Sequence, residues 1–216
     1  MADYDFVGFL IFGVVPFCLV FLYFIAYQIY FHCIIGLDVK YDLTKEQMKD
    51  LDQKVEKFLS DNNLYDSNCF DKIPEMLKVR ISHEHTNKTH GTFICTQNGD
   101  YTEVVMRKDL SLSEQRFVLA HVCGHIINNG TVPEYSNDKI RMNSISGNCA
   151  DYIALALLMP KKEISPFISG YSRCMCCPLN QKKTEYILGE ISEKYKVDFK
   201  FAQKRYRDLR RTAAAA

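Results

Sequence analysis

The first forty residues place the strongest constraint on how this chain can fold, because no charged side chain occurs between Asp5 and Asp38. The run between them is almost wholly apolar. A helix needs about 20 apolar residues to cross about 30 Å of hydrocarbon, so the run is long enough to span a bilayer. We expect the membrane span at residues 6–28, with the rings of Tyr27 and Tyr30 near the lipid headgroups.

A cleaved signal peptide is the alternative interpretation of this segment. It would require a basic start, a shorter apolar stretch and a small-residue cleavage site, which the segment lacks. No Lys or Arg precedes Lys40, and five lysines occur between positions 40 and 57. Because segments rich in Lys and Arg stay on the cytoplasmic side, we expect a single-pass protein with its N-terminus outside and its soluble domain in the cytoplasm. The nine cysteines agree, since their odd number and uneven spacing do not fit a secreted disulfide framework.

The rest of the chain has the composition of one globular domain. Hydrophobic residues make up 47% of the sequence, which excludes a disordered chain. The 27 basic and 26 acidic residues nearly balance, so we expect no direct binding of nucleic acid. We therefore divide the 216 residues into an anchor at 1–36, a folded domain at 37–211 and a disordered tail at 212–216.

Hydrophobic periodicity predicts an α+β domain with a small antiparallel sheet and several helices. Thr44 and Gln47 have the spacing of a capping box at the start of the first helix. Asn-Gly-Asp at 98–100 is typical of a hairpin turn. We expect helices at 44–61, 113–129, 148–159, 184–195 and 198–210, strands at 77–85, 91–97 and 101–108, and irregular chain at 161–183.

The stretch RFVLAHVCGHII (116–127) carries the strongest chemical signal. His121 and His125 stand one turn apart on the same helix face, so both imidazoles can reach one metal ion. Zinc peptidases with this spacing have a glutamate directly after the first histidine as the general base. Here Val122 occupies that position. Two histidines at this spacing are also compatible with ordinary packing inside a helix.

A second motif strengthens the metal interpretation. The passage from Val104 to Ile127, followed by ADYIALALLMP (150–160), resembles the ImmA/IrrE family of zinc metallopeptidases in the type, order and separation of its motifs. The similarity extends over about residues 44–210, everything except the anchor. It implies a zincin-like fold.

The resemblance also implies roles for individual residues. His121 and His125 match the family's two imidazole ligands for zinc. Cys149 stands where the family has its third ligand, a glutamate, and Val122 stands where it has the glutamate base. A cysteine thiolate binds zinc well and carries the same single negative charge as a carboxylate. Zinc is therefore expected, held by two histidines and one cysteine.

Valine cannot replace a general base in any protonation state, and no substitute stands near it in the sequence. Glu114 lies two turns before His121, and Cys123 points away from the ligand face. Asp151 is an alternative oxygen ligand, but it points about 200° away from Cys149 around the helix.

These features predict a membrane-anchored, ImmA/IrrE-like protein that keeps the peptidase scaffold and a metal but has impaired catalysis. By analogy with the family, its partner is a regulatory protein such as a helix-turn-helix repressor of a bacterial or phage system. An active zinc endopeptidase with an atypical His2Cys site is the alternative. A structural or adaptor protein without metal is the second alternative.

Three further clusters have weaker signals. Cys174, Cys176 and Cys177 can bind a second metal or carry acyl groups, or can be unreactive thiols of a loop. His83 and His85 share one strand face, where histidines more often are simply exposed. The basic stretch 182–211 can contact anionic lipid or nucleic acid, although a solvated helix face explains it as well.

Overall fold

The computed structural model describes residues 43–64, 69–84, 93–132, 145–171 and 181–213. The chain divides into two compact units, Met1–Lys40 and Tyr41–Ala216, and every described residue belongs to the second unit. The membrane span expected at 6–28 lies outside the described residues. Among the helices that are described, none is long and apolar enough to cross a membrane.

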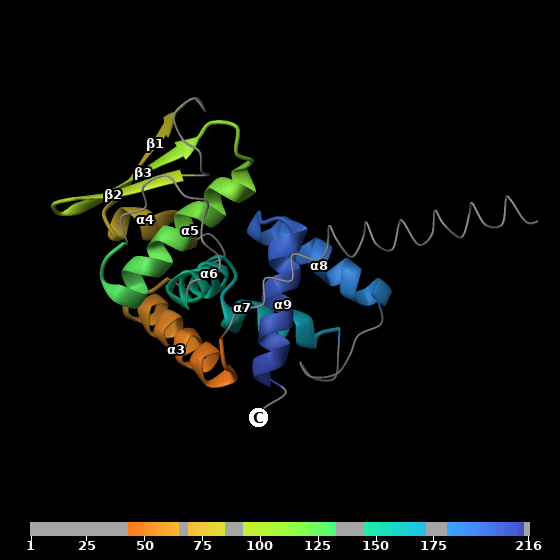
Figure 1. Cartoon of the computed structure of the whole chain (residues 1–216). Coiled ribbons are helices and arrows are strands. Elements are labelled where there is room, and N and C mark those ends of the chain that lie inside the picture. The colour runs from red at the N-terminus through yellow and green to blue at the C-terminus, as the bar shows by residue number, and fades with distance from the viewer. Residues whose placement is uncertain (1–42, 65–68, 85–92, 133–144, 172–180, 214–216) are drawn as a thin grey trace, which may run out of the picture. The chain divides into compact units, whose positions relative to one another are not determined.

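The described residues form an α+β domain of seven α-helices and a small sheet, as the sequence predicts (Figure 1). The strands are β1 (Val79–Glu84), β2 (Phe93–Asn98) and β3 (Tyr101–Arg107), in the spatial order β1-β3-β2. β2 and β3 form the expected antiparallel hairpin, with Gly99 in the left-handed region at φ 59°. β3 runs parallel to β1, however, so the sheet is mixed and the prediction of an antiparallel sheet is wrong.

The position of β3 explains the mixed sheet. After the hairpin, β3 runs opposite to β2 and lies between β2 and β1. The register pairs Val79 with Thr102 and Glu84 with Arg107 in parallel. Parallel neighbours need a long connection, and the chain from 85 to 100, which includes β2, provides it. Apolar alternation predicts each strand, but it does not say which strand takes the centre.

One face of the sheet is buried against helices. Along β3 the side chains of Thr102, Val104 and Met106 are buried, and those between them are partly exposed. Figure 1 shows the short helix α4 (Ile73–Met76) and the long helix α5 (Leu112–Asn129) beneath the sheet. A 3-10 turn, η2 (Cys69–Lys72), leads into α4, and the sequence patterns predict neither element.

The first described helix, α3 (Lys45–Asp61), begins where the sequence predicts. Thr44 and Gln47 form both hydrogen bonds of a capping box, so they satisfy backbone N–H groups that the first turn leaves without partners. The buried positions recur at helical spacing and pack toward α6 (Ile145–Leu158). The apolar ones are Met48, Leu51, Val55 and Leu59.

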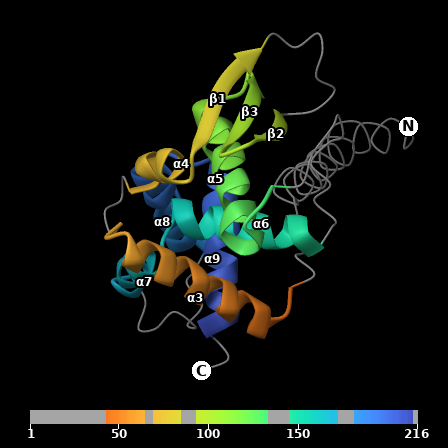
Figure 2. The ribbon, with the colours of Figure 1, turned by 90° about the vertical axis from the view of Figure 1, so that its left-hand side faces the viewer.

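α5 and α6 form the centre of the domain, and Figure 2 shows the two helices crossing. α5 begins with a second capping box, made by Ser111 and Glu114, and ends at Gly130 with φ 74°. In the segment 150–160, which contains most of α6, every residue is buried. A helix that is apolar on all sides belongs in the interior of a domain.

A helix follows Pro160 directly, inside the stretch 161–183 that we expect to be irregular. Pro160 comes just after α6 and is the N-cap of α7 (Lys161–Ser169). Ile164 and Ile168 are buried one turn apart, and this spacing of four is the helical signal in the sequence. That part of the prediction is therefore wrong.

Two longer helices complete the domain. α8 (Gln181–Tyr195) begins three residues before its predicted start, and α9 (Phe199–Ala213) continues three residues beyond its predicted end. Between them Lys196 takes a left-handed conformation at φ 53°. Val197, next to it, is buried, and its N–H donates to the Ser192 carbonyl at 3.0 Å. This tight turn lets α8 and α9 pack against each other.

A buried ion pair joins α3 to α9. Nη2 of Arg205 lies 3.1 Å from Oδ1 of Asp52, and its Nε donates to the carbonyl oxygen of Met159 at 3.2 Å. Both charged side chains are buried. Lys161 Nζ approaches the second carboxylate oxygen at 3.8 Å. Because a desolvated charge is tolerated only when it is paired, this contact fixes α9 against α3 and the end of α6.

We expect Arg205→Met to lower the free energy of unfolding by about 3–5 kcal/mol, because it leaves the buried Asp52 carboxylate without its guanidinium partner. Urea denaturation followed by circular dichroism measures the change. Arg207→Met on the exposed side of the same helix is the control and should change stability by less than about 0.5 kcal/mol. The double variant Asp52→Leu/Arg205→Met removes both charges and should recover most of the loss. An unrecovered double variant would contradict the explanation.

Candidate metal centre

The two histidines expected to bind metal lie side by side inside the domain. His121 and His125 occupy successive turns of α5, and each is only 1% exposed. Their Nε2 atoms are 3.1 Å apart and their ring planes meet at 80°. Two nitrogens on one tetrahedral zinc ion, with bonds of about 2.0–2.1 Å, are about 3.3 Å apart. The spacing of four residues thus brings both imidazoles to one point, at a separation that fits a shared ion.

The carboxylate of Asp151 holds His121 from the other side of its ring. Asp151 is fully buried on α6, and its Oδ1 lies 2.8 Å from Nδ1 of His121. An ionised carboxylate only accepts hydrogen bonds, so beside it a neutral His121 carries its proton on Nδ1 and keeps the lone pair on Nε2. Metal-binding histidines are commonly oriented in this way. The sequence suggests Asp151 as an alternative ligand, whereas in the structure it orients a histidine.

The contact between the two imidazoles is itself a hydrogen bond. Because Nε2 of His121 is an acceptor, Nε2 of His125 is the donor. Burial, together with a smaller effect of the neighbouring His121, lowers the pKa of His125 to about 4, and Asp151 opposes the change. His125 is therefore neutral at pH 7, and it would bind a metal through Nε2 only as the tautomer with its proton on Nδ1.

A close crossing of α5 and α6 sets this geometry. A Cβ atom added to Gly124 would lie 2.7 Å from the carbonyl oxygen of Ala150, so only glycine lets the two backbones approach this closely. Gly124 directly precedes His125, and Ala150 directly precedes Asp151. The backbone contact therefore holds the imidazoles and the carboxylate within hydrogen-bond distance.

Cys149, the third ligand implied by the resemblance, lies in the first turns of α6 and is half-buried. Burial raises the pKa of its thiol, and the amine of Lys54 opposes this effect. Within the residues that the structure describes, no three His, Cys, Asp or Glu side chains gather as a metal ion would require. The structure supplies two imidazoles and an orienting carboxylate, and the His2Cys site stays a prediction.

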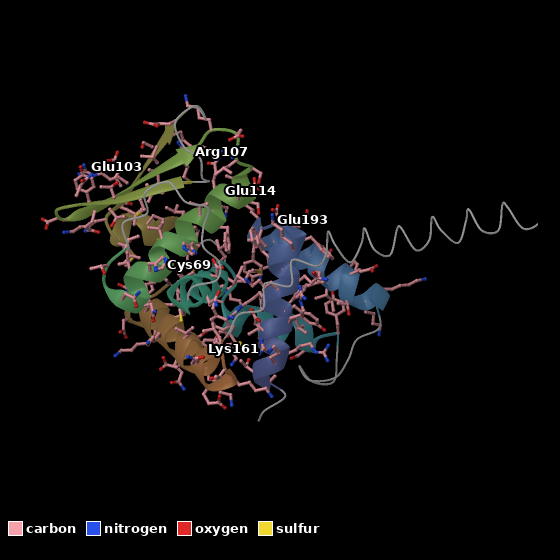
Figure 3. The ribbon with its side chains drawn as sticks, in the orientation of Figure 1. Cys69, Glu103, Arg107, Glu114, Lys161 and Glu193 are labelled. Carbon is pink, nitrogen blue, oxygen red and sulfur yellow. The ribbon has the colours of Figure 1, made fainter. Side chains whose placement is uncertain are left out.

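Val122, which by resemblance stands at the position of the general base, is fully buried in the hydrophobic core. Glu114 lies at the start of α5, near Arg107 in Figure 3. Hydrogen bonds from the backbone N–H and the hydroxyl of Ser111, each 2.9 Å long, lower the pKa of its carboxyl group. Burial raises the pKa of the Cys123 thiol to about 12. Glu114 is thus held as a helix cap and Cys123 as a neutral thiol, so neither is poised to act as a base.

Of the weaker clusters of histidines and cysteines, the structure describes only His83. His83 on β1 is exposed, and its Nε2 lies 3.3 Å from Oε1 of Gln115 on α5. This contact links the edge of the sheet to a helix. His85 and the cysteines at 174, 176 and 177 lie outside the described residues.

Residues 74–207 match the model of a protein family described as the IrrE N-terminal-like domain, Peptidase_M78. The match covers more than half of the 216 residues and includes the sheet, the histidine pair and most of α9. It agrees with the resemblance carried by the two helical motifs. No curated protein matches the chain at a significant level.

We expect Gly124→Ala to lower the free energy of unfolding by about 1–3 kcal/mol, the usual range for overpacking, because α5 and α6 must move apart. Gly189→Ala on α8 is the matched control. A Cβ added there meets no atom within 4 Å, so this variant should be stabilised by up to about 1 kcal/mol. Urea denaturation of both variants provides the comparison, and equal effects would argue against a constraining helix crossing.

We expect the chelator-treated protein to lose stability as the pH falls from 6.5 to 4. The unfolded imidazole of His125 takes up its proton near its ordinary pKa of 6.5, whereas the folded one stays neutral down to about pH 4. Over this interval only the unfolded state gains the proton, so about 3 kcal/mol of the stability at pH 7 is lost by pH 4. Urea midpoints at pH 7, 5.5 and 4 measure the loss. His125→Gln should reduce it, and an unaltered pH dependence in that variant would refute the assignment.

Proposed function

Because the chain belongs to the IrrE N-terminal-like domain family, we propose that it is a membrane-held, metallopeptidase-like protein that binds a regulatory protein and has little or no peptidase turnover. Val122 is the observation that carries this proposal. It is fully buried in the core, at the position that corresponds by resemblance to the catalytic glutamate.

The missing base has a large expected effect on the reaction rate. A positioned general base accelerates proton transfer by about 10²–10⁴-fold, which corresponds to ~3–5 kcal/mol of the activation barrier. Valine has no atom that accepts a proton. The cap at Glu114 and the neutral thiol of Cys123 support the view that no neighbouring side chain takes over.

The metal is the second part of the proposal. His121 and His125 would hold a zinc ion, with the thiolate of Cys149 as third ligand. The close Nε2 atoms and the carboxylate of Asp151 behind His121 support this arrangement. A bound zinc ion would supply Lewis-acid chemistry. The protein's own contribution is to hold His121 in the tautomer whose Nε2 lone pair is available.

The location and the partner follow from different observations. The uncharged run ending before Asp38, and the lysines after it, support a membrane anchor with the domain on the cytoplasmic side. The family resemblance supports a partner such as a helix-turn-helix regulator. A peptidase scaffold that keeps its core helices but lacks the base can still bind its former substrate.

A metal-free adaptor is the second candidate function. The hydrogen bond between His121 and His125 favours it, because each imidazole already uses its Nε2 in an internal contact. In this case the two histidines and Asp151 would be a buried polar link between α5 and α6.

The full chain, purified in detergent without chelator or metal-affinity tag, tests these alternatives. We expect one equivalent of zinc, lost in His121→Ala and in Cys149→Ala, and no zinc-dependent cleavage of casein or of a helix-turn-helix repressor. Strong zinc-dependent cleavage that His121→Ala abolishes would overturn the proposal in favour of an active peptidase. Absence of zinc would favour the adaptor, and zinc retained by Cys149→Ala would exclude Cys149 as a ligand.

Val122→Glu shows whether only the base is missing. Val122→Gln is the matched control, since it has nearly the same shape and no basic oxygen. With zinc bound, we expect Val122→Glu to cleave about 10²–10⁴-fold faster than Val122→Gln. Thermal unfolding of both variants is needed beside the assay, because a carboxylate in this buried position destabilises the fold.

A further inference from the structure

One side of α9 faces the histidine pair. The helix packs against α6, and Figure 2 shows the two helices crossing. Near the start of α9 the ring of Phe201 stacks on Phe117 of α5, with 4.2 Å between the ring centroids and 11° between the ring planes. Phe117 in turn lies beside the imidazole of His121, at 6.4 Å between centroids. The side of α9 that carries Phe201 is therefore the side next to the histidines.

Lys204 lies on this same side of α9. It follows Phe201 by three residues and precedes Asp208 by four, so the three side chains are neighbours along one helix face. Lys204 is partly buried and Asp208 is buried. Burial, with a smaller effect of Arg207, lowers the pKa of Lys204 to about 8, and the nearby carboxylates of Asp151 and Asp208 oppose the change. Lys204 is therefore a cation at pH 7 with two buried carboxylates beside it.

Asp151 needs such a cation, because it is a fully buried carboxylate with few hydrogen bonds. Its Oδ1 lies 2.8 Å from Nδ1 of His121. Among the residues that the structure describes, no hydrogen-bond donor reaches its Oδ2. A buried carboxylate is tolerated when hydrogen bonds and an opposite charge compensate the water that it has lost. A neutral imidazole supplies one hydrogen bond and no charge, whereas the ammonium of Lys204 supplies the charge.

Asp208 does not depend on Lys204 in the same way. Burial raises the pKa of Asp208 to about 6, and several cations of its own helix oppose this change. Arg205 has the largest opposing effect, ahead of Lys204, and Arg211 and Arg207 follow. Because Asp208 has arginines on both sides along the helix, the charge of Lys204 is available to Asp151.

We propose that Lys204 is a positioning residue of the candidate metal centre: its charge holds the Asp151 carboxylate against Nδ1 of His121, and so keeps the proton away from Nε2. Partners of this kind commonly change the affinity of a site for its metal by about 10–100-fold. For this effect on affinity the inference rests on the proposed metal-binding function. The contact of Asp151 with His121 exists without metal, so the positioning itself can be measured in the metal-free chain.

Nuclear magnetic resonance of the imidazole nitrogens in the full chain, in detergent and after treatment with chelator, tests the positioning. A ring nitrogen that carries a proton and one that does not give well-separated signals, and His121→Gln identifies the signals of His121 among the six histidines. We expect Nδ1 of His121 to carry the proton in the wild type. The population of this tautomer should fall about twofold or more in Lys204→Met and be retained in Lys204→Arg, which keeps the charge. Lys57→Met, the same substitution at an exposed position of α3, should leave it unchanged.

Zinc titration of the same chains gives a second measurement, in which we expect Lys204→Met to bind zinc about tenfold or more weakly than Lys204→Arg or Lys57→Met. If Lys204→Met unfolds, Lys204→Met/Asp208→Asn takes its place, because it also removes the neighbouring carboxylate, and it should show the same loss of the His121 tautomer. An unchanged tautomer in the folded variant would overturn this inference and assign Lys204 to Asp208 alone. A wild-type chain that binds no zinc, but whose His121 tautomer depends on Lys204, would support the positioning role and overturn only the proposed metal function.

Discussion

The close contact between the backbones of α5 and α6 at Gly124 and Ala150 is the constraint on which the rest of the domain depends. It brings two apolar helices so close that their backbones meet, and the side chains of α5 and α6 pack around this point. His125 follows Gly124 on α5, and Asp151 follows Ala150 on α6. Two polar side chains of the site therefore come from residues next to the backbone contact. The sheet covers one side of α5, and α3 packs along α6. A methyl group at position 124 would thus disturb the core and the site together.

Charges that are removed from water hold the outer helices onto this centre. Arg205 reaches inward from α9 to Asp52 of α3 and to the last turn of α6, and it gives the C-terminal helix a single orientation about its axis. The same orientation determines which of the remaining cations of α9 face outward. The packing that buries Arg205 therefore also leaves Arg207 and Arg211 exposed. The ion pair between Arg205 and Asp52 thus determines which charges of α9 lie at the surface.

Local chemistry allowed much of the fold to be predicted from the sequence. Thr44 with Gln47, and Asn-Gly-Asp at 98–100, act through neighbouring backbone atoms, so their structures could be read from short segments. The convergence of His121 and His125 follows in the same way from one helical turn. The parallel pairing of β1 and β3, and the contact of Asp151 with Nδ1 of His121, depend on tertiary placement, which spacing does not encode. The prediction of irregular chain after Pro160 is wrong because a proline that follows one helix is equally suited to the beginning of the next.

The nearly complete burial of the histidine pair has a kinetic consequence. With each imidazole 1% exposed, an ion or a peptide group can reach Nε2 only when the surrounding structure opens. The frequency of this opening, rather than diffusion, then sets the rate at which a ligand binds to or leaves the two histidines. The ring N–H protons of both histidines should also exchange slowly with solvent. Any ligand that becomes bound is released on the same slow timescale. A centre of this kind would exchange a bound ligand slowly.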